Sequence, residues 1–385
     1  MRAMIYLDYA ATTPISKNAK ETLISALDSY PGNPSSIHTC GIKAKKKLNA
    51  TKKGVATLLG TTHKHLLFTG SGSEASNTVI KGVFQKNKSK TIVTTTVEHA
   101  ATKESVAYVE REGGTVAYCP VDKKGFLDLK TLETLLKTHD VSLVSVIHAN
   151  NEIGTVQDVG PLRTLTSKYG ALLHLDMVQS VPHMKVSLEE ECIDFASMSA
   201  HKFFGPRGTG VLYFRDKDAF TPLIHGGHQE MRKRAGTENL ANIAAMHTAL
   251  NDTLNNISKQ EDTIKSLGKR FLNGLEHSGI DYRLNGPSYE SDKRLHNVLN
   301  IGFKAIHGGQ LAFELDQMGF CVSQGSACHE DSVELSHVLK AISVPDSYIK
   351  GSIRFSFSHR ETVEDIDSLL KALKTIITSG DASLE

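Results

Sequence analysis

Short apolar runs alternate with amphipathic stretches through the middle of the chain, from about residue 66 to about residue 214. Helical patterns separate most of these runs, for example at 74–86, 100–112, 128–138 and 159–169. The strand-like runs occupy 66–69, 91–97, 115–119, 141–148, 171–176, 193–198 and 210–214. Alternation of this kind predicts an α/β fold in which helices cover both faces of a mostly parallel, seven-stranded sheet.

The pattern differs toward both ends of the chain. A short strand within 5–14 is followed by helical patterns at about 17–29 and 40–59. After about residue 255 the chain shows a long charged helix to about 278, strands at 296–303, 320–323 and 351–357, and helices at 308–318 and 362–378. We therefore predict a large domain over residues 15–257 and a smaller α+β domain built from residues 1–14 and 258–385.

Composition and charge exclude several classes of function. The 385 residues include 44 basic and 42 acidic side chains, so no overall charge favours nucleic acid or an anionic membrane as a partner. The first residues lack a signal-peptide core and no apolar run is long enough to span a membrane, so we expect a cytoplasmic protein. The five cysteines have no zinc-binding spacing, and we expect no metal site.

The carboxyl ends of the predicted strands carry the candidate chemistry, because ligands of parallel sheets bind at that edge. The first strand ends in Gly70-Ser71-Gly72-Ser73, a turn that opens a helix and suits a phosphate group. The same turn fits the dinucleotide fingerprint Gly-x-Gly-x-x-Ala, with Glu98 as a candidate ribose-binding acid. A dinucleotide-binding protein is therefore an alternative from a different class.

The later strand ends favour pyridoxal phosphate. Lys202 follows a strand and precedes two aromatic residues, a poorly hydrated setting that lowers the pKa of an amine and suits a Schiff base. Asp176 can keep a pyridine nitrogen protonated, and the flat ring of His99 can stack on the cofactor. The amides of Asn151 and Gln179 can contact its phenolic oxygen. The dinucleotide interpretation explains only two of the strand-end groups.

Many segments along the chain resemble one known family, the cysteine desulfurases of the NifS/IscS type. This family lies in the fold-type I (class V aminotransferase) group of pyridoxal phosphate enzymes. The matching segments are LDYAATTP at 7–14, GNPSSIH at 32–38, FTGSGSEASN at 68–77, EHAA at 98–101, ANNEIGTVQD at 149–158, HLDMVQS at 174–180, SMSAHKFFGPRGTG at 197–210, RAGTEN at 234–239, QGSACHE at 324–330, SHVLKA at 336–341 and SIRFSFSHRET at 352–362.

The resemblance implies a role for each matching position. Lys202, His99 and Cys328 would be catalytic, with Cys328 as the nucleophile in a mobile loop at about 324–335. Arg354, with Asn151, would bind the substrate. The cofactor would be held by Lys202, Gly72, Ser73, His99, Asn151, Asp176, Gln179, Ser199 and His201, and by Thr237 of a neighbouring subunit in a homodimer.

The resemblance also implies a reaction. L-Cysteine would be converted to L-alanine, and its sulfur would pass to Cys328 as a persulfide. The sulfur would then go to an acceptor protein for iron–sulfur cluster assembly or tRNA thiolation. A related lyase or aminotransferase, such as a selenocysteine lyase, is the alternative within the same group of enzymes.

Overall fold

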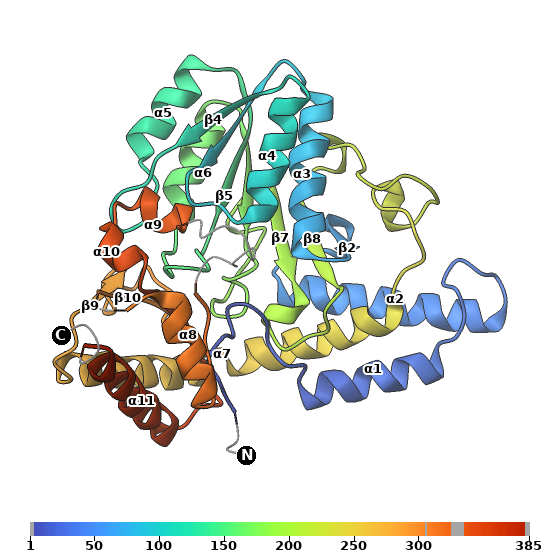
Figure 1. The fold of residues 1–385 in the computed structure, drawn as a ribbon. Helices are drawn as coiled ribbons and strands as arrows, with labels where there is room; N and C mark the ends of the chain where they lie inside the picture. The colour runs from blue at the N-terminus through green and yellow to red at the C-terminus, as the bar shows by residue number, and fades with distance from the viewer. Residues whose placement is uncertain (1–3, 305, 325–334, 382–385) are drawn as a thin grey trace.

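The structure is a computed structural model, and it describes residues 4–304, 306–324 and 335–381. Its centre is the sheet of seven strands that the sequence predicts (Figure 1). The strands lie in the order β2-β8-β7-β6-β5-β3-β4, and only β8 runs antiparallel to its neighbours. Their bounds are β2 Leu66–Thr69, β3 Thr91–Thr95, β4 Thr115–Cys119, β5 Val141–Ile147, β6 Leu172–Asp176, β7 Phe195–Ser199 and β8 Gly210–Phe214.

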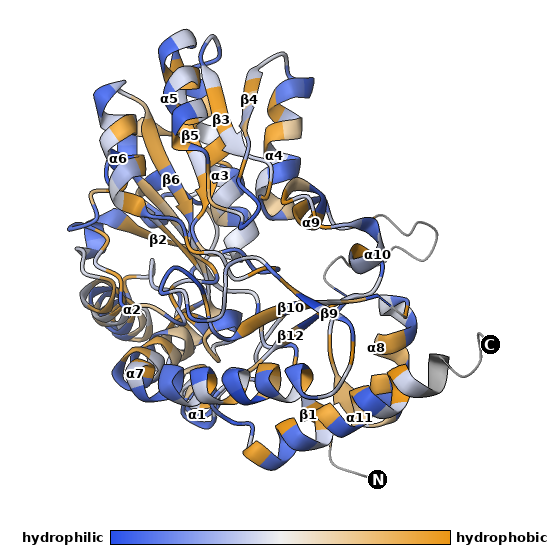
Figure 2. Cartoon of the chain, turned by 90° about the vertical axis from the view of Figure 1, so that its left-hand side faces the viewer, coloured by the Kyte–Doolittle hydropathy of each residue, from blue (hydrophilic) through white to orange (hydrophobic). Residues whose placement is uncertain are grey.

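Helices pack on both faces of this sheet, which is why its central strands are apolar almost throughout. All seven residues of β5 are buried. One hydrophobic core lies under α3 (Gly72–Lys86) and α4 (Ala100–Arg111). The core on the other face lies under α2 Thr39–Leu58, α5 Leu129–Thr138, α6 Val159–Lys168 and α7 Leu240–Glu276. Hydrophobic residues accordingly concentrate in the strands, and hydrophilic ones on the outer sides of the helices (Figure 2).

A smaller unit contains the C-terminal part of the chain. Its antiparallel sheet has the strand order β12-β10-β9, and β1 pairs in parallel with β11. The N-terminal strand β1 therefore lies beside β11 in this unit. The elements are β1 Ile5–Tyr6, β9 Tyr282–Asn285, β10 Val298–Phe303, α8 Gly308–Gln317, β11 Phe320–Cys321, α9 His337–Ala341, α10 Asp346–Ile349, β12 Ser352–Ser356 and α11 Val363–Asp381.

The helix α7 connects the two units. It runs along the base of the molecule, packing on α1 (Lys17–Ser29) and α2 at one end and on α11 at the other (Figure 1). The sequence predicted its start near residue 255, whereas the helix begins at Leu240, where Asn239 caps it. The proposed domain boundary after residue 257 falls inside this continuous helix. Among the described residues, no helix is long and apolar enough to cross a membrane.

The core of the small unit depends on Phe271 of α7. This side chain is fully buried, and its ring centroid lies 5.0 Å from that of Phe355 and 5.7 Å from that of Phe357. We expect Phe271→Ala to lower the free energy of unfolding by about 3–5 kcal/mol, because it leaves a cavity in a packed core. Denaturant titration measures the change. Phe313→Ala is the control, since Phe313 is 66% exposed and its removal should cost less than about 0.5 kcal/mol.

Candidate active site

A cavity of about 230 Å³ lies at the carboxyl ends of the parallel strands. Each wall comes from a different strand end or from the N-terminal segment, so the sheet topology itself brings the polar groups together. The lining includes most of the residues that the sequence singled out: Gly72, Ser73, His99, Asn151, Asp176, Gln179, Ser199, His201 and Lys202.

Lys202 follows β7 at the end of a short 3-10 turn, Ala200–Lys202. Its Nζ donates hydrogen bonds to the carbonyl oxygens of Ala10 at 2.6 Å and Ala11 at 2.8 Å. Burial and, next, the positive charge of Arg354 together lower the pKa of Lys202 to about 8, against the opposing charges of Asp176 and Asp8. The amine is therefore partly neutral near physiological pH, as a nucleophile or proton acceptor requires.

Asp176 is the last residue of β6, and its carboxylate lies at the floor of the cavity. One oxygen, Oδ1, accepts a hydrogen bond of 3.1 Å from the backbone N–H of Val178. Burial raises the pKa of Asp176, while His99 and Lys202 oppose the rise. A buried carboxylate of this kind gains most from a cationic N–H placed against it.

His99 caps the N-terminus of α4, with its Nδ1 accepting a hydrogen bond of 3.1 Å from the N–H of Ala101. Its pKa is lowered, chiefly by burial, so the ring is neutral and its proton sits on Nε2. Gln179 is fixed by a 2.8 Å hydrogen bond from Nε2 to the carbonyl oxygen of Ala10. Both side chains present polar edges to the cavity.

The glycine turn forms the opposite wall. Ser71 caps α3 by accepting a hydrogen bond from the N–H of Glu74 at 3.0 Å, and Glu74 accepts one from Gly70 at 2.7 Å. A Cβ on Gly72 would lie 2.6 Å from a methyl group of Val178, so a side chain there would collide with the cavity wall. The backbone N–H groups in the first turn of a helix have no partner within the helix and suit an anion.

Two phosphate candidates remain: Ser199 is the last residue of β7, and His201 lies in the turn that follows. The Nδ1 of His201 lies 3.1 Å from Oγ1 of Thr12. Burial and, next, the charges of Lys202 and Arg207 together lower the pKa of His201 to about 4. The ring is therefore neutral and can contribute a hydrogen bond to a phosphate group.

Arg354 lies on β12 and is not part of the cavity lining, but it hydrogen-bonds Asn151, which is. Its Nη2 donates to Oδ1 of Asp8 at 2.9 Å, and its Nη1 donates to the carbonyl oxygen of Asn151 at 3.1 Å. Its Nε is buried and has no hydrogen-bond partner among the described residues. The guanidinium is thus fixed in place by two of its five N–H donors, and the N–H of Nε is among those left over.

Two more candidates are not in the lining that the structure describes. Thr237 lines a second cavity, of about 260 Å³, together with Glu230 and Arg234. Cys328, with most of the expected loop at 324–335, lies outside the described residues. Among the described residues, no group of three or more His, Cys, Asp or Glu side chains could hold a metal ion.

The dinucleotide interpretation of Glu98 is wrong. Its side chain is buried, and its Oε1 accepts hydrogen bonds from Oγ1 of Thr95 at 2.6 Å and from the N–H of Ile147 at 2.9 Å. It therefore points into the sheet and cannot reach a ribose. The strand ends do not predict the contributions of Asp8, Ala10 and Ala11. These residues accept the hydrogen bonds that hold Arg354, Gln179 and Lys202 in place. The resemblance of the segment LDYAATTP at 7–14 to the cysteine desulfurases was the one sign in the sequence that these residues matter.

The lining of the cavity fits pyridoxal phosphate. It combines an amine with a lowered pKa, a buried carboxylate to which no cationic side chain of the described residues is bonded, a flat neutral imidazole, and a helix N-terminus where glycine leaves room for an anion. An aldehyde, a protonated ring nitrogen, a ring face and a phosphate group are the matching parts of the cofactor.

The family model described as aminotransferase class-V matches residues 5–369. The chain belongs to this family. Enzymes of the aminotransferase class-V family that are cysteine desulfurases depend on pyridoxal phosphate.

Similar proteins cover nearly the whole chain. A cysteine desulfurase IscS of Dictyoglomus turgidum is 40% identical, over 98% of this chain and 95% of that protein. One of Methanosarcina thermophila is 36% identical, over 97% and 92%. A solved structure of a NifS-like protein is 33% identical with a TM-score of 0.90, covering 97% of this chain and 99% of that one. The apo cysteine desulfurase of Thermococcus onnurineus is 25% identical with a TM-score of 0.86, covering 98% and 95%.

The lowered pKa of Lys202 makes a testable prediction. Only the neutral amine adds to an aldehyde, so the rate at which cofactor-free protein takes up pyridoxal phosphate should rise with pH and level off above about pH 8. Arg354→Ala removes a positive charge that disfavours the protonated amine, so the midpoint of this profile should move to higher pH. Stopped-flow absorbance measures the rate. Arg207→Ala, which removes an exposed arginine, should leave the midpoint unchanged, and an unchanged midpoint in Arg354→Ala would contradict the assignment.

Proposed function

We propose that this protein is a pyridoxal-phosphate-dependent cysteine desulfurase that converts L-cysteine to L-alanine and passes the sulfur to an acceptor protein. The observation that carries the proposal is one cavity that combines the partly neutral amine of Lys202 with the buried carboxylate of Asp176. The fixed guanidinium of Arg354 is hydrogen-bonded to Asn151 in the lining of the same cavity. The names of the relatives, which are cysteine desulfurases, support the same reaction.

The cofactor would be held through groups that are already fixed by the fold. Lys202 would bind its aldehyde carbon, Asp176 its ring nitrogen and His99 its ring face. Asn151 and Gln179 would contact the ring oxygen. The phosphate would be bound by Gly72 and Ser73 at the N-terminus of α3 and by Ser199 and His201 after β7.

When bound, the cofactor supplies an electron sink that stabilises the negative charge left on the substrate Cα when its proton departs. Lys202 would take that proton, because an amine with a pKa of about 8 is an effective base near neutral pH. The carbonyl oxygens of Ala10 and Ala11 would keep the amine directed into the cavity in the intervals between proton transfers.

Arg354 would bind the substrate carboxylate. Its unpartnered Nε, together with the remaining hydrogens of its Nη groups, offers donors in the forked geometry that carboxylates favour. Asp8 and the Asn151 carbonyl would hold the guanidinium at the correct angle, so that the substrate carboxylate lies at a constant distance from Lys202.

Cys328 would be the nucleophile, a role that rests on the sequence. Its thiolate would attack the sulfur of the substrate, forming an S–S bond while the substrate Cβ–S bond breaks and the electron pair stays with carbon. Protonation of that carbon leaves alanine, and the sulfur remains on Cys328 as a persulfide. A cysteine nucleophile on the chain favours a desulfurase over a selenocysteine lyase or an aminotransferase.

The activity test is a balance of products. Holoenzyme given L-cysteine and a reductant should release sulfide and alanine in equal amounts. Cys328→Ser should abolish both products while the near-visible absorbance of the bound cofactor persists, because the serine hydroxyl cannot accept sulfur. Cys40→Ser, which removes an exposed thiol, should stay active. Full turnover by Cys328→Ser would exclude the persulfide route.

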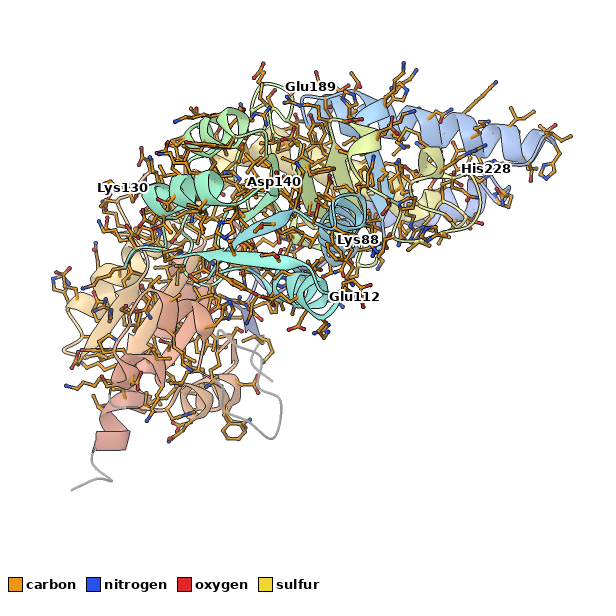
Figure 3. The ribbon with its side chains drawn as sticks, turned by 90° about the horizontal axis from the view of Figure 1, so that it is seen from above. Lys88, Glu112, Lys130, Asp140, Glu189 and His228 are labelled. Carbon is orange, nitrogen blue, oxygen red and sulfur yellow. The ribbon has the colours of Figure 1, made fainter. Side chains whose placement is uncertain are left out.

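The protein would act as a homodimer in which Thr237 contacts the phosphate held by the other subunit. Several large apolar side chains are exposed on α1, just before α2, on α2, and in the segment 224–231 that precedes Thr237: Ile24, Leu27, Ile37, Ile42, Ile224 and Met231. The segment around His228 and the N-terminal half of α2 lie at the same end of the molecule in two views (Figures 1 and 3). Exposed apolar side chains gathered in this way are typical of an interface between subunits.

Subunit mixing tests this arrangement. Lys202→Ala lacks the cofactor amine and Thr237→Ala lacks the group that reaches across, so each homodimer should have strongly reduced activity. A mixed dimer has one site with both Lys202 and the Thr237 of the partner intact, and should recover activity toward half of the wild-type value. Co-purification with two different tags followed by the alanine assay measures the recovery. Mixed dimers as inactive as the parents would show that Thr237 serves its own subunit.

The sulfur acceptor would be an iron–sulfur scaffold protein or a tRNA-thiolation enzyme. The names of the IscS relatives favour iron–sulfur cluster assembly. Scattered, unpaired cysteines fit a reducing compartment, so we place the protein in the cytoplasm.

A further inference from the structure

The buried carboxyl group of Glu98 joins two strand ends beneath the active site. Glu98 comes shortly after β3, and it is 1% exposed. Its Oε1 accepts hydrogen bonds from Oγ1 of Thr95 at 2.6 Å and from the N–H of Ile147 at 2.9 Å. Ile147 ends β5 and lies directly opposite Asp176 in the β5–β6 register, so the contact reaches the strand pair that carries Asp176.

Two backbone carbonyl oxygens at Glu98 and beside it also accept hydrogen bonds from other elements. The carbonyl oxygen of Val97 accepts a 3.0 Å hydrogen bond from Nδ2 of Asn150, and that of Glu98 accepts one of 2.9 Å from Nε2 of His337 on α9. The residues next to these anchors, His99 and Asn151, line the cavity. A shift of the turn at 96–98 would therefore move His99 relative to Asp176.

The surroundings of the other oxygen of Glu98, Oε2, disfavour the ionised form of the carboxyl group. Oε2 is buried and has no hydrogen-bond partner among the described residues. Burial, with a smaller contribution from the charge of Asp176, raises the pKa of Glu98 to about 8 in spite of the hydrogen bonds from Thr95 and Ile147, which lower it. Asp176 is the charged group that faces it from β6; Thr95 and Ile147 are uncharged, and His337 contacts only its backbone oxygen.

We propose that Glu98 is a positioning residue that works as a neutral carboxylic acid: it fixes the turn before His99 to the end of β5 and leaves Asp176 the ionised carboxylate at the floor of the cavity. An ionised Glu98 would place a second buried negative charge beside Asp176, and two neighbouring buried carboxylates disfavour each other's ionisation. The inference concerns the site of the proposed desulfurase, but its first test does not depend on that activity.

The first test compares the pH dependence of stability in three holoproteins. Glu98→Gln keeps the acceptor at Oε1 and cannot ionise, and Glu104→Gln, an exposed residue of α4, is the matched control. The folded pKa of Glu98 lies above the unfolded one, so the folded state keeps a proton that the unfolded state has lost between about pH 4.5 and 8. Stability that depends on this group is therefore present at low pH and is lost as pH rises.

The expected result is that wild type loses stability relative to Glu98→Gln between about pH 5 and 8, by up to about tenfold in the unfolding equilibrium constant per pH unit, and by no more above that range. Thermal unfolding midpoints measured across pH report this difference. Glu104→Gln should follow wild type at every pH. Parallel curves for wild type and Glu98→Gln would show that Glu98 is ionised in the folded protein, and would overturn the proposal.

The second test separates positioning from charge. Glu98→Gln should keep the wild-type kcat and cofactor absorbance near pH 7. Glu98→Ala, which removes the link between the strand ends, should lose roughly 100-fold in kcat with a smaller change in KM, because His99 and Asp176 are no longer held in register. Equal losses in both variants would show that the negative charge is required, and full activity in Glu98→Ala would exclude a positioning role.

The proposal about Glu98 and the proposed function can fail independently. If wild type releases no alanine from L-cysteine, the function fails, while the stability curves still report the state of Glu98. If Glu98→Ala does not fold, the pH comparison with Glu98→Gln decides the proposal without it.

Discussion

The site depends on the way in which one buried amine is held. Nζ of Lys202 donates to two backbone carbonyl oxygens, so its hydrogen bonds are satisfied without a carboxylate bonded to it. Burial and Arg354 can then lower its pKa to about 8. Lys168 shows the opposite case, since it bonds Glu133 at the surface and its pKa is raised. A direct ion pair would have kept Lys202 protonated and unreactive.

The same constraint explains the course of the N-terminal segment. To deliver the carbonyls of Ala10 and Ala11, the chain must pass between the large sheet and the small unit, and side-chain contacts hold it on both sides. Gln179 donates to the Ala10 carbonyl, while the Ala10 N–H donates to Oγ of Ser356. Asp8 in this segment also bonds Arg354. One short stretch thus aligns the amine with the guanidinium.

The sequence predicts the large sheet well because buried parallel strands are nearly continuous apolar runs, as in β5. The sequence predicts secondary structure less well where an element is too short to show a hydrophobic period, or where apolar residues continue past the end of an element. The elements β9, α9 and α10 each have at most five residues and were not expected, and the start of α7 was placed too late because its first turns lie in a long run of apolar and small residues without a break.

The residues of the candidate site likewise fall into those that the sequence predicts and those that it does not. Strand-end side chains such as Asp176 and Lys202 follow from topology, since parallel strands end at one edge of the sheet. The direction in which a strand-end side chain points does not follow, which is why Glu98 was a candidate ribose ligand in the dinucleotide alternative. Backbone carbonyls have no signature in a sequence, so the acceptors of Lys202 could not be found from the residue types. Arg354 and Thr237 came from the resemblance alone.

The 37-residue helix α7 gives the molecule a shared element about 55 Å long. Its first half contributes Ile243 and Ala249 to the core beneath the large sheet, and its second half contributes Phe271 and Leu275 to the core of the small unit. If either core melted, half of the helix would lose the surface against which it packs. The two units therefore form a single cooperative structure. A mutation or a rise in temperature that destabilises one unit also lowers the stability of the other.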